Sequence, residues 1–345
     1  MQLFSKFILI LIILCGGLIP LKSQSVTFNI VIADTTPIIR NIVEVDSGYV
    51  LVGGGMNNQV YIITVFIDSV GTLKWIKKIK NSSISLYHGT DGSFIANNQG
   101  YSLAGSQNNA TQNGCWLLKF DNNFDTLWTQ VYLMDSVFKG FYGGCTTDSG
   151  FLLTGIIDID IFGNPVVYDN VLLIKTDNAG NMLWYKNYGG NDADIGYKVI
   201  PTYDNSYLIG GWTRSFNTFV AQGYRGDWYL VKTDTAGNKI WDRHYGNKYL
   251  DDGRMISLIS TKDTGYIMTG GHAVSDGTSF VVTRGKIMKL NKYYQVEWEK
   301  LYDAEKERTA LEAIIELENS DLAVTGCVEN SSGNLYGTLH KLTSD

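Results

Sequence analysis

The feature of this sequence that most constrains its fold is a strand-like phrase that recurs at nearly constant spacing. The phrase opens with an aromatic residue or leucine and has glycine four residues later. Its six copies begin at Tyr49, Tyr101, Phe151, Tyr207, Tyr266 and Leu322. Successive copies start 50 to 59 residues apart, and a unit of that size is too small to bury a core alone. Neighbouring units must therefore pack on one another, which predicts a single repeat domain.

A second phrase keeps step with the first and ends in tryptophan. It joins a strand, a tight turn and a Trp, most clearly over residues 173–184 and 230–241. Gly180 and Gly237 in these turns can adopt positive φ, which is typical of hairpins. We expect the large ring after each turn to fill the space between neighbouring sheets. We therefore interpret five tryptophans as structural, namely Trp75, Trp128, Trp184, Trp241 and Trp298.

The fourth copy predicts four strands, over residues 196–202, 207–211, 227–233 and 239–245. Apolar side chains on both sides of the third strand indicate burial of both faces. Four short strands per repeat are typical of one β-propeller blade. The predicted fold is therefore all-β, a single six-bladed β-propeller of four-stranded blades, with a seven-bladed propeller as the alternative.

The two ends of the chain bear on how the ring closes. The sixth copy stops at 341–345, where its turn and tryptophan phrase should begin. At the other end, residues 28–32 form a strand-like segment at the matching distance from Tyr49. We expect this N-terminal strand to complete the C-terminal blade and remove both exposed sheet edges. Residues 303–318 carry charges and helix-favouring residues, and we interpret them as a loop that leads into an inner strand, with a helix as the alternative.

The N-terminus has the pattern of a secretory signal peptide. Lys6 precedes an apolar run over residues 7–15, and small and polar residues follow it. We therefore divide the chain into a signal peptide over 1–25 and a β-propeller domain over 26–345. The apolar run is shorter than the roughly 20 residues of a membrane span, although lipid attachment at Cys15 is an alternative. The expected location is secreted, cell-surface or periplasmic, with no transmembrane segment after signal removal.

Charge and cysteine content exclude several classes. The net charge of −6 gives no electrostatic reason to expect a nucleic-acid partner. Beyond the leader, Cys115, Cys145 and Cys327 lie far apart and have no metal-ligand spacing. Exported chains meet oxidising conditions, so one disulfide is an alternative, but we expect three buried single thiols.

Acidic residues cluster at two equivalent positions between repeats, 189–196 and 246–253. They include Asp192, Asp194, Asp251 and Asp252. Carboxylates of this kind can bind Ca²⁺, but neither segment has the spacing of a calcium loop, and turn formation explains them equally well. We therefore expect no metal and no cofactor, with calcium as the alternative.

No catalytic constellation stands out in the sequence. The histidines show no ligand spacing, and a G-x-S-x-G nucleophile motif is absent from the sequence. We predict neither catalytic nor ligand-binding residues. Of the four histidines, we expect His244 and His340 on strands. We expect His88 and His272 near loops.

The repeat resembles that of secreted bacterial propeller proteins, which are common among Bacteroidota. The shared pattern is written loosely as GYILAG … LIKTDxxGNxxWxKxYGG, and the match is closest over residues 151–246. This resemblance implies the propeller fold and export from the cell. It implies little about activity, because most such proteins have no assigned activity.

The expected function follows from a repeat scaffold without catalytic residues. We expect an exported, non-catalytic, monomeric propeller that binds a protein or polysaccharide at the cell surface through loops on one face. The loops proposed for this contact are 158–169, 214–226 and 273–284. Their aromatic residues suit a sugar or protein surface, namely Phe162, Tyr168, Phe216, Phe219, Tyr224 and Phe280. The alternatives are an envelope-associated lyase or hydrolase with a site at the central channel, and a purely structural envelope component.

Overall fold

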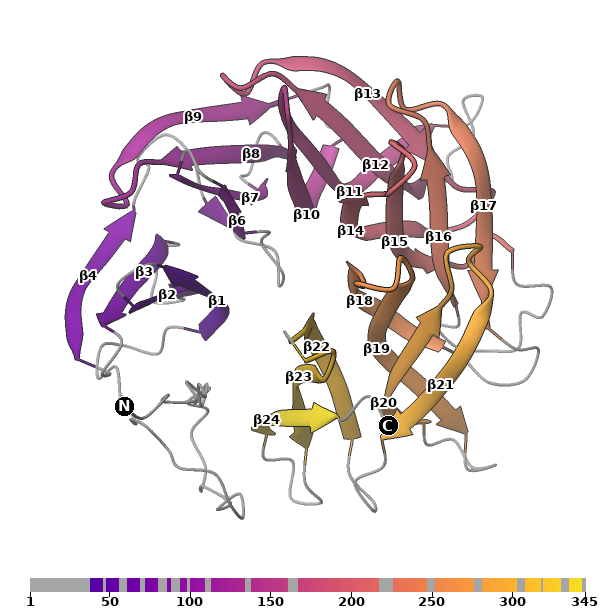
Figure 1. Cartoon of the computed structure of the whole chain (residues 1–345). Helices are drawn as coiled ribbons and strands as arrows, with labels where there is room; N and C mark the ends of the chain where they lie inside the picture. Colours follow the sequence, from indigo (N-terminus) through magenta and orange to yellow (C-terminus); the bar gives the residue numbers. More distant parts are fainter. Residues whose placement is uncertain are drawn as a thin grey trace.

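The described part of the chain consists of β-strands in six antiparallel sheets. The computed structural model describes residues 38–45, 48–55, 61–68, 72–79, 86–87, 94–97, 100–108, 113–133, 138–160, 167–216, 226–246, 252–275, 281–302, 308–317, 319–329 and 335–342. The sheets follow one another in chain order around a ring (Figure 1). The expected signal peptide and the expected closing strand over 28–32 lie outside the described residues.

Each sheet takes its strands from one copy of the repeat. Sheet 1 contains β1 (Ile38–Val45), β2 (Gly48–Gly55), β3 (Tyr61–Asp68) and β4 (Leu73–Ile79). Sheet 2 contains β5 (Leu86–Tyr87), β6 (Phe94–Asn97), β7 (Gly100–Asn108), β8 (Asn113–Phe120) and β9 (Thr126–Tyr132). Sheet 3 contains β10 (Phe138–Thr147), β11 (Gly150–Asp160), β12 (Val167–Thr176) and β13 (Met182–Tyr188).

The remaining three sheets follow the same order. Sheet 4 contains β14 (Asp194–Pro201), β15 (Tyr207–Thr213), β16 (Asp227–Thr233) and β17 (Lys239–Tyr245). Sheet 5 contains β18 (Asp252–Ser260), β19 (Tyr266–Ser275), β20 (Val281–Leu290) and β21 (Val296–Tyr302). Sheet 6 contains β22 (Arg308–Glu316), β23 (Leu322–Glu329) and β24 (Leu335–Leu342). The four strands predicted for the fourth copy are thus confirmed, with shifts of up to two residues at the ends of β14 and β15.

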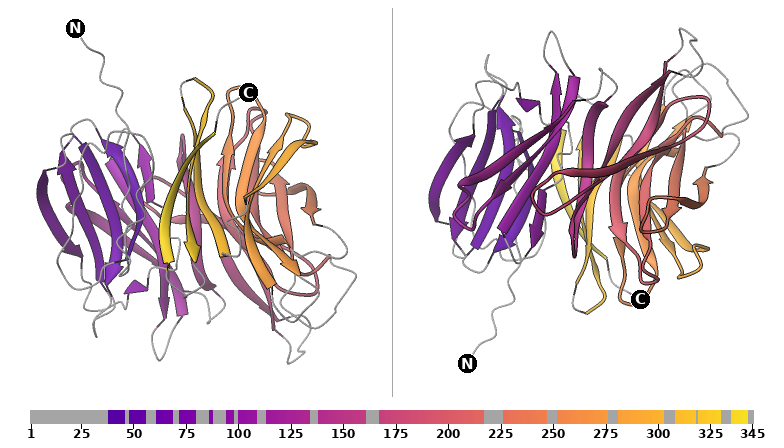
Figure 2. Two further views of the ribbon diagram at one scale, coloured as in Figure 1. Left: turned by 90° about the horizontal axis from the view of Figure 1, so that it is seen from below. Right: turned by 90° about the horizontal axis from the view of Figure 1, so that it is seen from above.

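The last strands of sheets 1 to 5 lie on the perimeter of the ring, while the first strands line its interior (Figure 1). Seen edge-on, the outer strands slant across the rim (Figure 2), as the twist of β-sheets requires. Sheets 1 to 6 pack face to face in chain order, because hydrophobic side chains fill the space between each sheet and the next.

The hydrophobic core is divided into five clusters, and each cluster lies between two consecutive sheets. Every repeat tryptophan packs into the cluster that joins its own sheet to the next. The ring of Trp128, for example, meets Phe151 of the next sheet edge-on at 6.1 Å between centroids. The structural interpretation of the five tryptophans is confirmed.

The turn before each outer strand uses the left-handed backbone conformation. Gly180 and Gly237 have φ of 80° and 79°, as their hairpin role predicts. Phe124 and Tyr294 occupy the same turn position in sheets 2 and 5, with φ of 61° and 64°. An aromatic side chain in this conformation is not expected from the sequence, because the left-handed region normally costs free energy for residues other than glycine.

Several smaller predictions can be compared with the structure. Residues 308–316 form the inner strand β22. The inner strand predicted within residues 303–318 is therefore confirmed, and the alternative of a helix is wrong for residues 308–316. Cys115 and Cys145 are free thiols, but Cys145 is only partly buried. Burial raises the pKa of the Cys145 thiol to about 12. Among the described residues, no helix is long and apolar enough to cross a membrane.

Candidate functional site

The structure brings two predicted regions together at the junction between sheets 3 and 4. Asp194, from the first acidic cluster, begins β14 and is fully buried. Thr213 lies opposite it on β15 and donates its hydroxyl to Oδ1. Oδ2 accepts hydrogen bonds from Ser215 Oγ at 2.7 Å and from the Gly190 amide at 2.8 Å. The acidic cluster and the start of the 214–226 loop therefore form one polar unit.

Burial dominates the electrostatics of Asp194. It raises the pKa of the Asp194 carboxyl, and the Thr213, Ser215 and Gly190 donors only partly offset this rise. A Cβ atom on Gly189 would lie 2.2 Å from Asp194 Oδ2, so this position must stay glycine for the carboxylate to fit. Gly189 therefore has a packing role beside Asp194.

Asp192 continues the polar unit toward solvent. Its carboxylate lies 3.6 Å from the Arg214 guanidinium, and its amide donates to Ser215 Oγ at 3.0 Å. Within the described ranges, no group of three or more His, Cys, Asp or Glu side chains could hold a metal ion. In the second acidic cluster, Asp251 lies outside the described residues, and Asp252 begins β18 opposite His272.

A histidine and a carboxylate pair stands beside this unit. Asp227 begins β16 opposite Thr213, and its side chain is only 7% exposed. His244, on the outer strand β17, has Nδ1 2.9 Å from Asp227 Oδ2, and its side chain is 46% exposed. Donation from Nδ1–H to the carboxylate leaves Nε2 as a proton acceptor. The pair has the arrangement of an oriented general base.

Phe216 fixes the orientation of this imidazole. Its ring stacks on that of His244 at 5.8 Å between centroids and 16° between planes. The other neighbour of Phe216 is Tyr229, at 5.4 Å. A Cβ on Gly190 would lie 3.8 Å from the Phe216 ring, so the loop that holds Asp194 also contacts the residue that positions His244.

A shallow groove of about 330 Å³ runs along the rim of the same junction. One wall is the end of β13 and the other is the turn into β17. Its lining includes three asparagines and two lysines, and polar and apolar atoms contribute about equally to its surface. The lining residues are Asn170, Lys186, Asn187, Tyr188, Gly189, Gly237, Asn238 and Lys239. Gly189 lines this groove and also packs against Asp194, so the groove adjoins the polar unit; Phe216 and His244 are not among its lining residues.

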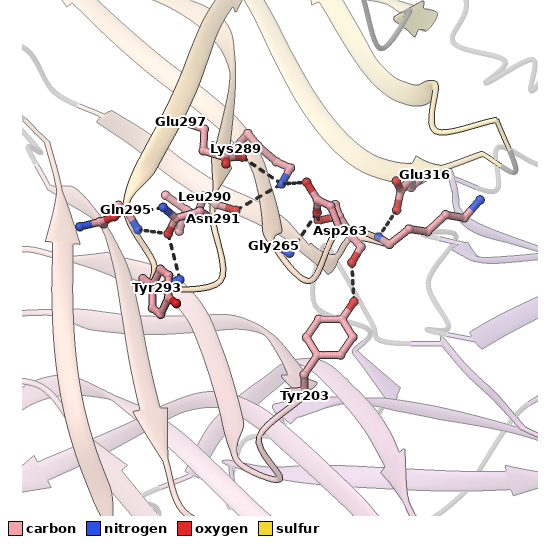
Figure 3. A network of polar contacts seen from close by, with 12 residues as sticks. Tyr203, Asp263, Gly265, Lys289, Leu290, Asn291, Tyr293, Gln295, Glu297 and Glu316 are labelled. Carbon is pink, nitrogen blue, oxygen red and sulfur yellow. Dashed lines mark hydrogen bonds and ion pairs between the residues drawn. The ribbon is translucent and has the colours of Figure 1, made fainter.

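A second polar network lies at the turns of sheet 5 and connects three sheets (Figure 3). Lys289 Nζ lies 2.7 Å from Asp263 and 3.2 Å from Glu297. Tyr203 of sheet 4 donates to the Thr261 carbonyl, and Glu316 of sheet 6 accepts from the Lys262 amide at 2.8 Å. The side chains satisfy one another, so we interpret this network as structural.

The other predicted residues are not brought to the junction. His272 lies within β19 and is buried, so its expected place near a loop is wrong. His340 lies on β24, and His88 lies outside the described residues. Of the six loop aromatics, Phe216 reaches the site. Tyr168 falls within β12, while the other four lie outside the described residues, namely Phe162, Phe219, Tyr224 and Phe280.

The sequence did not single out Asn170, Lys186 or Asp227 as site residues. Asp227 and His244 are 17 residues apart, and their proximity comes from the hairpin register in which Tyr229 pairs with His244. That register follows from the turn at Gly237, so the pair could have been found by aligning the two predicted strands.

Comparison with known proteins finds likeness in fold alone. No family model matches the chain, and no curated protein does. A Dyadobacter fermentans protein of unknown function is similar with a TM-score of 0.56 and 10% identity, over 88% of this chain and 93% of that one. A Trypanosoma rangeli sialidase, solved with sialic acid, is similar with a TM-score of 0.53 and 12% identity, over 88% of this chain and 54% of the sialidase chain. Together with the ring of sheets, these likenesses indicate a propeller-like all-β fold.

Proposed function

We propose that this chain is an exported six-bladed β-propeller that acts on a saccharide as a hydrolase or lyase, with His244 as its general base. Six sheets in chain order support the blade count. The last sheet has three described strands, which leaves room for the N-terminal strand 28–32 to complete it. Export rests on the signal peptide that the sequence predicts over 1–25.

The observation that carries the activity is the pairing of a half-exposed imidazole with a buried carboxylate. Asp227 holds the His244 tautomer whose Nε2 is free to take a proton. In hydrolysis, that proton would come from a water whose oxygen bonds to the glycosidic carbon, while the bond to the leaving sugar breaks and its oxygen takes a proton from solvent. In elimination, it would come from the carbon beside a carboxyl group, while the bond from the next carbon to the leaving sugar breaks, a double bond forms and the leaving oxygen takes a proton from solvent. Phe216 limits rotation of the ring, which keeps the base oriented. The site lies on the rim between two sheets, away from the central channel that the sequence-based enzyme alternative assumed.

A non-catalytic glycan- or protein-binding propeller, which the sequence favours, is the second candidate. The groove beside the pair supports binding in either case. The two candidates differ only in whether His244 does chemistry, and that difference is measurable.

The test is turnover of a polysaccharide panel by the full chain and by His244→Gln. Release of reducing ends reports hydrolysis or elimination, and ultraviolet absorbance of the new double bond reports elimination alone. We expect His244→Gln to lower kcat about 100-fold or more while the fold is retained. His340→Gln, on another sheet, is the matched control and should retain activity. Binding without turnover by the native protein, or full activity of His244→Gln, would support the second candidate instead.

A further inference from the structure

We propose that the groove between sheets 3 and 4 binds an acidic saccharide, and that Lys186 recognises its negative charge. This inference rests on the proposed function, because it assigns the substrate class of the same site. The groove is lined by Lys186 and by Gly189. The next residue, Gly190, lies near Phe216, since a Cβ atom built on it would be 3.8 Å from that ring, and Phe216 stacks on His244.

The first argument is what Lys186 does compared with its counterparts. In each of sheets 1 to 5, one outer-strand residue pairs with the same position of the third strand. These five counterparts are Lys77, Gln130, Lys186, Arg243 and Lys300. Three of them hold the turn of the next sheet. Lys77 binds the Asn123 carbonyl and Asp125 at 2.5 and 2.6 Å, Gln130 binds the Ala179 carbonyl at 3.4 Å, and Arg243 binds the Tyr294 carbonyl at 3.1 Å.

Lys186 makes no such bond within the described part of the chain. Its stem packs beside the turn instead, since a Cβ on Gly237 would lie 3.0 Å from Lys186 Cγ. Lys239 on the opposite wall is ion-paired with Asp242 at 2.8 Å. Lys186 is therefore the groove cation that has no hydrogen bond or ion pair among the described residues, and its charge also helps to lower the pKa of Asp234 in the facing turn. An anion that approaches Lys186 gains a charge-assisted hydrogen bond.

The second argument is the set of amides around this charge. Asn187 and Asn238 line the groove, and an amide can both donate to and accept from a sugar hydroxyl. Asn170 also lines it, with a side chain 7% exposed. Its Oδ1 has no hydrogen-bond partner among the described residues, and a buried acceptor in that condition costs free energy. A hydroxyl that reaches this amide would remove that cost.

Size is consistent with a small part of a polysaccharide chain. The groove volume of about 330 Å³ lies at the lower end of the range of ligand clefts, roughly 300–1,000 Å³. A ligand with one anionic group beside several hydroxyls would match the groove, in which Lys186 lies among several asparagines. A saccharide that carries carboxylates meets this description, and an uncharged saccharide lacks the group that Lys186 would bind.

The test is calorimetric titration of the full chain with hexagalacturonate, and with cellohexaose as the uncharged counterpart. We expect the native protein to bind the acidic hexamer more tightly, with affinity that falls as salt rises. Lys186→Gln places the side chain of Gln130 at this position and should weaken binding about tenfold or more. Lys300→Gln is the matched control, because Lys300 holds the equivalent position in sheet 5. It should leave the affinity unchanged.

Equal affinity of the native protein and Lys186→Gln would overturn the assignment, as would absence of binding to the acidic hexamer. His244→Gln separates this proposal from the proposed function. If that variant binds the acidic hexamer normally but no longer turns it over, both proposals stand. If Lys186→Gln loses binding while His244→Gln retains full turnover, the proposal that the groove binds an acidic saccharide is supported. The proposal that His244 is the general base is then wrong.

Discussion

The junction between sheets 3 and 4 and the junction between sheets 4 and 5 are built from the same repeat, but only the first contains the groove. At the turn facing the preceding tryptophan, the first has Gly237 and the second has Tyr294. The Tyr294 ring stacks on Tyr266 at 5.0 Å and meets Trp241 edge-on at 4.6 Å. Gly237 brings no side chain to this position: the ring of Trp184 and the stem of Lys186 pack directly against it, and Gly237 is one of the residues that line the groove.

The comparison teaches that a repeat can make a site by omission. Arg243 closes the second junction by donating to the carbonyls of Tyr293 and Tyr294. Lys186, at the same position in the first, is left facing the groove. The first junction thus combines a glycine at the turn with an outer-strand lysine that has no hydrogen bond among the described residues, and the tryptophan contacts that hold the sheets together are retained.

The largest expected effect comes from emptying the filled junction. Tyr294→Gly removes two aromatic contacts of a residue that is 7% exposed, and it relieves only the strain of a positive φ. We expect the free energy of unfolding to fall by about 3 kcal/mol, measured by urea denaturation. Tyr293→Ala is the control, because Tyr293 is 64% exposed and its loss should change stability by less than about 0.5 kcal/mol. Similar losses for both variants would mean that Tyr294 does not fill the junction.

A smaller effect distinguishes the two outer-strand cations. Arg243→Gln loses charge-assisted hydrogen bonds to turn carbonyls and should lower the free energy of unfolding by about 1 kcal/mol. Lys186→Gln loses no such bond and should change stability by less than about 0.5 kcal/mol. Denaturation of both variants under one set of conditions tests this order. A larger loss for Lys186→Gln would show that Lys186 already holds the turn.

The smallest effect concerns the network that ties sheet 5 to its neighbours (Figure 3). Burial raises the pKa of Asp263, but hydrogen bonds from Lys289, Thr261 and Gly265 outweigh it and bring the pKa to about 2. A lowered carboxyl pKa stabilises the fold above the unfolded pKa, and that stability is lost as the pH falls from about 4 to about 2. Because Asp263 is 59% exposed, solvent screening limits the contribution to about 0.5–1 kcal/mol.

The measurement is the pH dependence of unfolding for the native chain and Asp263→Asn. The free energy of unfolding of the native protein should fall by about 0.5–1 kcal/mol as the pH falls from about 4 to about 2. The variant should not show this fall. Identical slopes would mean that the Asp263 carboxylate is not held in its charged form by Lys289.

Much of the fold could be predicted because the repeat fixes both the length and the order of the strands. The third and fourth strands of sheet 4 were predicted to the residue, since the turn at Gly237 sets their register. The aromatic turn residues Phe124 and Tyr294 could not be predicted, because their strain is offset by tertiary contacts. Each stacks on a tyrosine of its own sheet and contacts the tryptophan of the preceding sheet. His272 was misplaced because β19 continues beyond its glycines to Ser275.

The candidate site was predicted only in fragments. The acidic segment containing Asp194 was predicted as an alternative calcium site and the loop containing Phe216 as a binding loop, but their spatial contact was not predicted. Their contact depends on strand pairing between β14 and β15. Lys186 could not be identified from the sequence, because a lysine in a repeated strand is common. What distinguishes it is the hydrogen bond to the turn of the next sheet, which three of its counterparts make and Lys186 does not.

By itself, the sequence determined that this chain is an all-β repeat protein, because apolar spacing and hairpin turns are local properties. It also determined the packing role of the tryptophans, since five of the six units carry one at the same place. Only the tertiary structure decided where a ligand could be held. The differences that create the groove are single residues, and their effect depends on which side chain of the next sheet faces them.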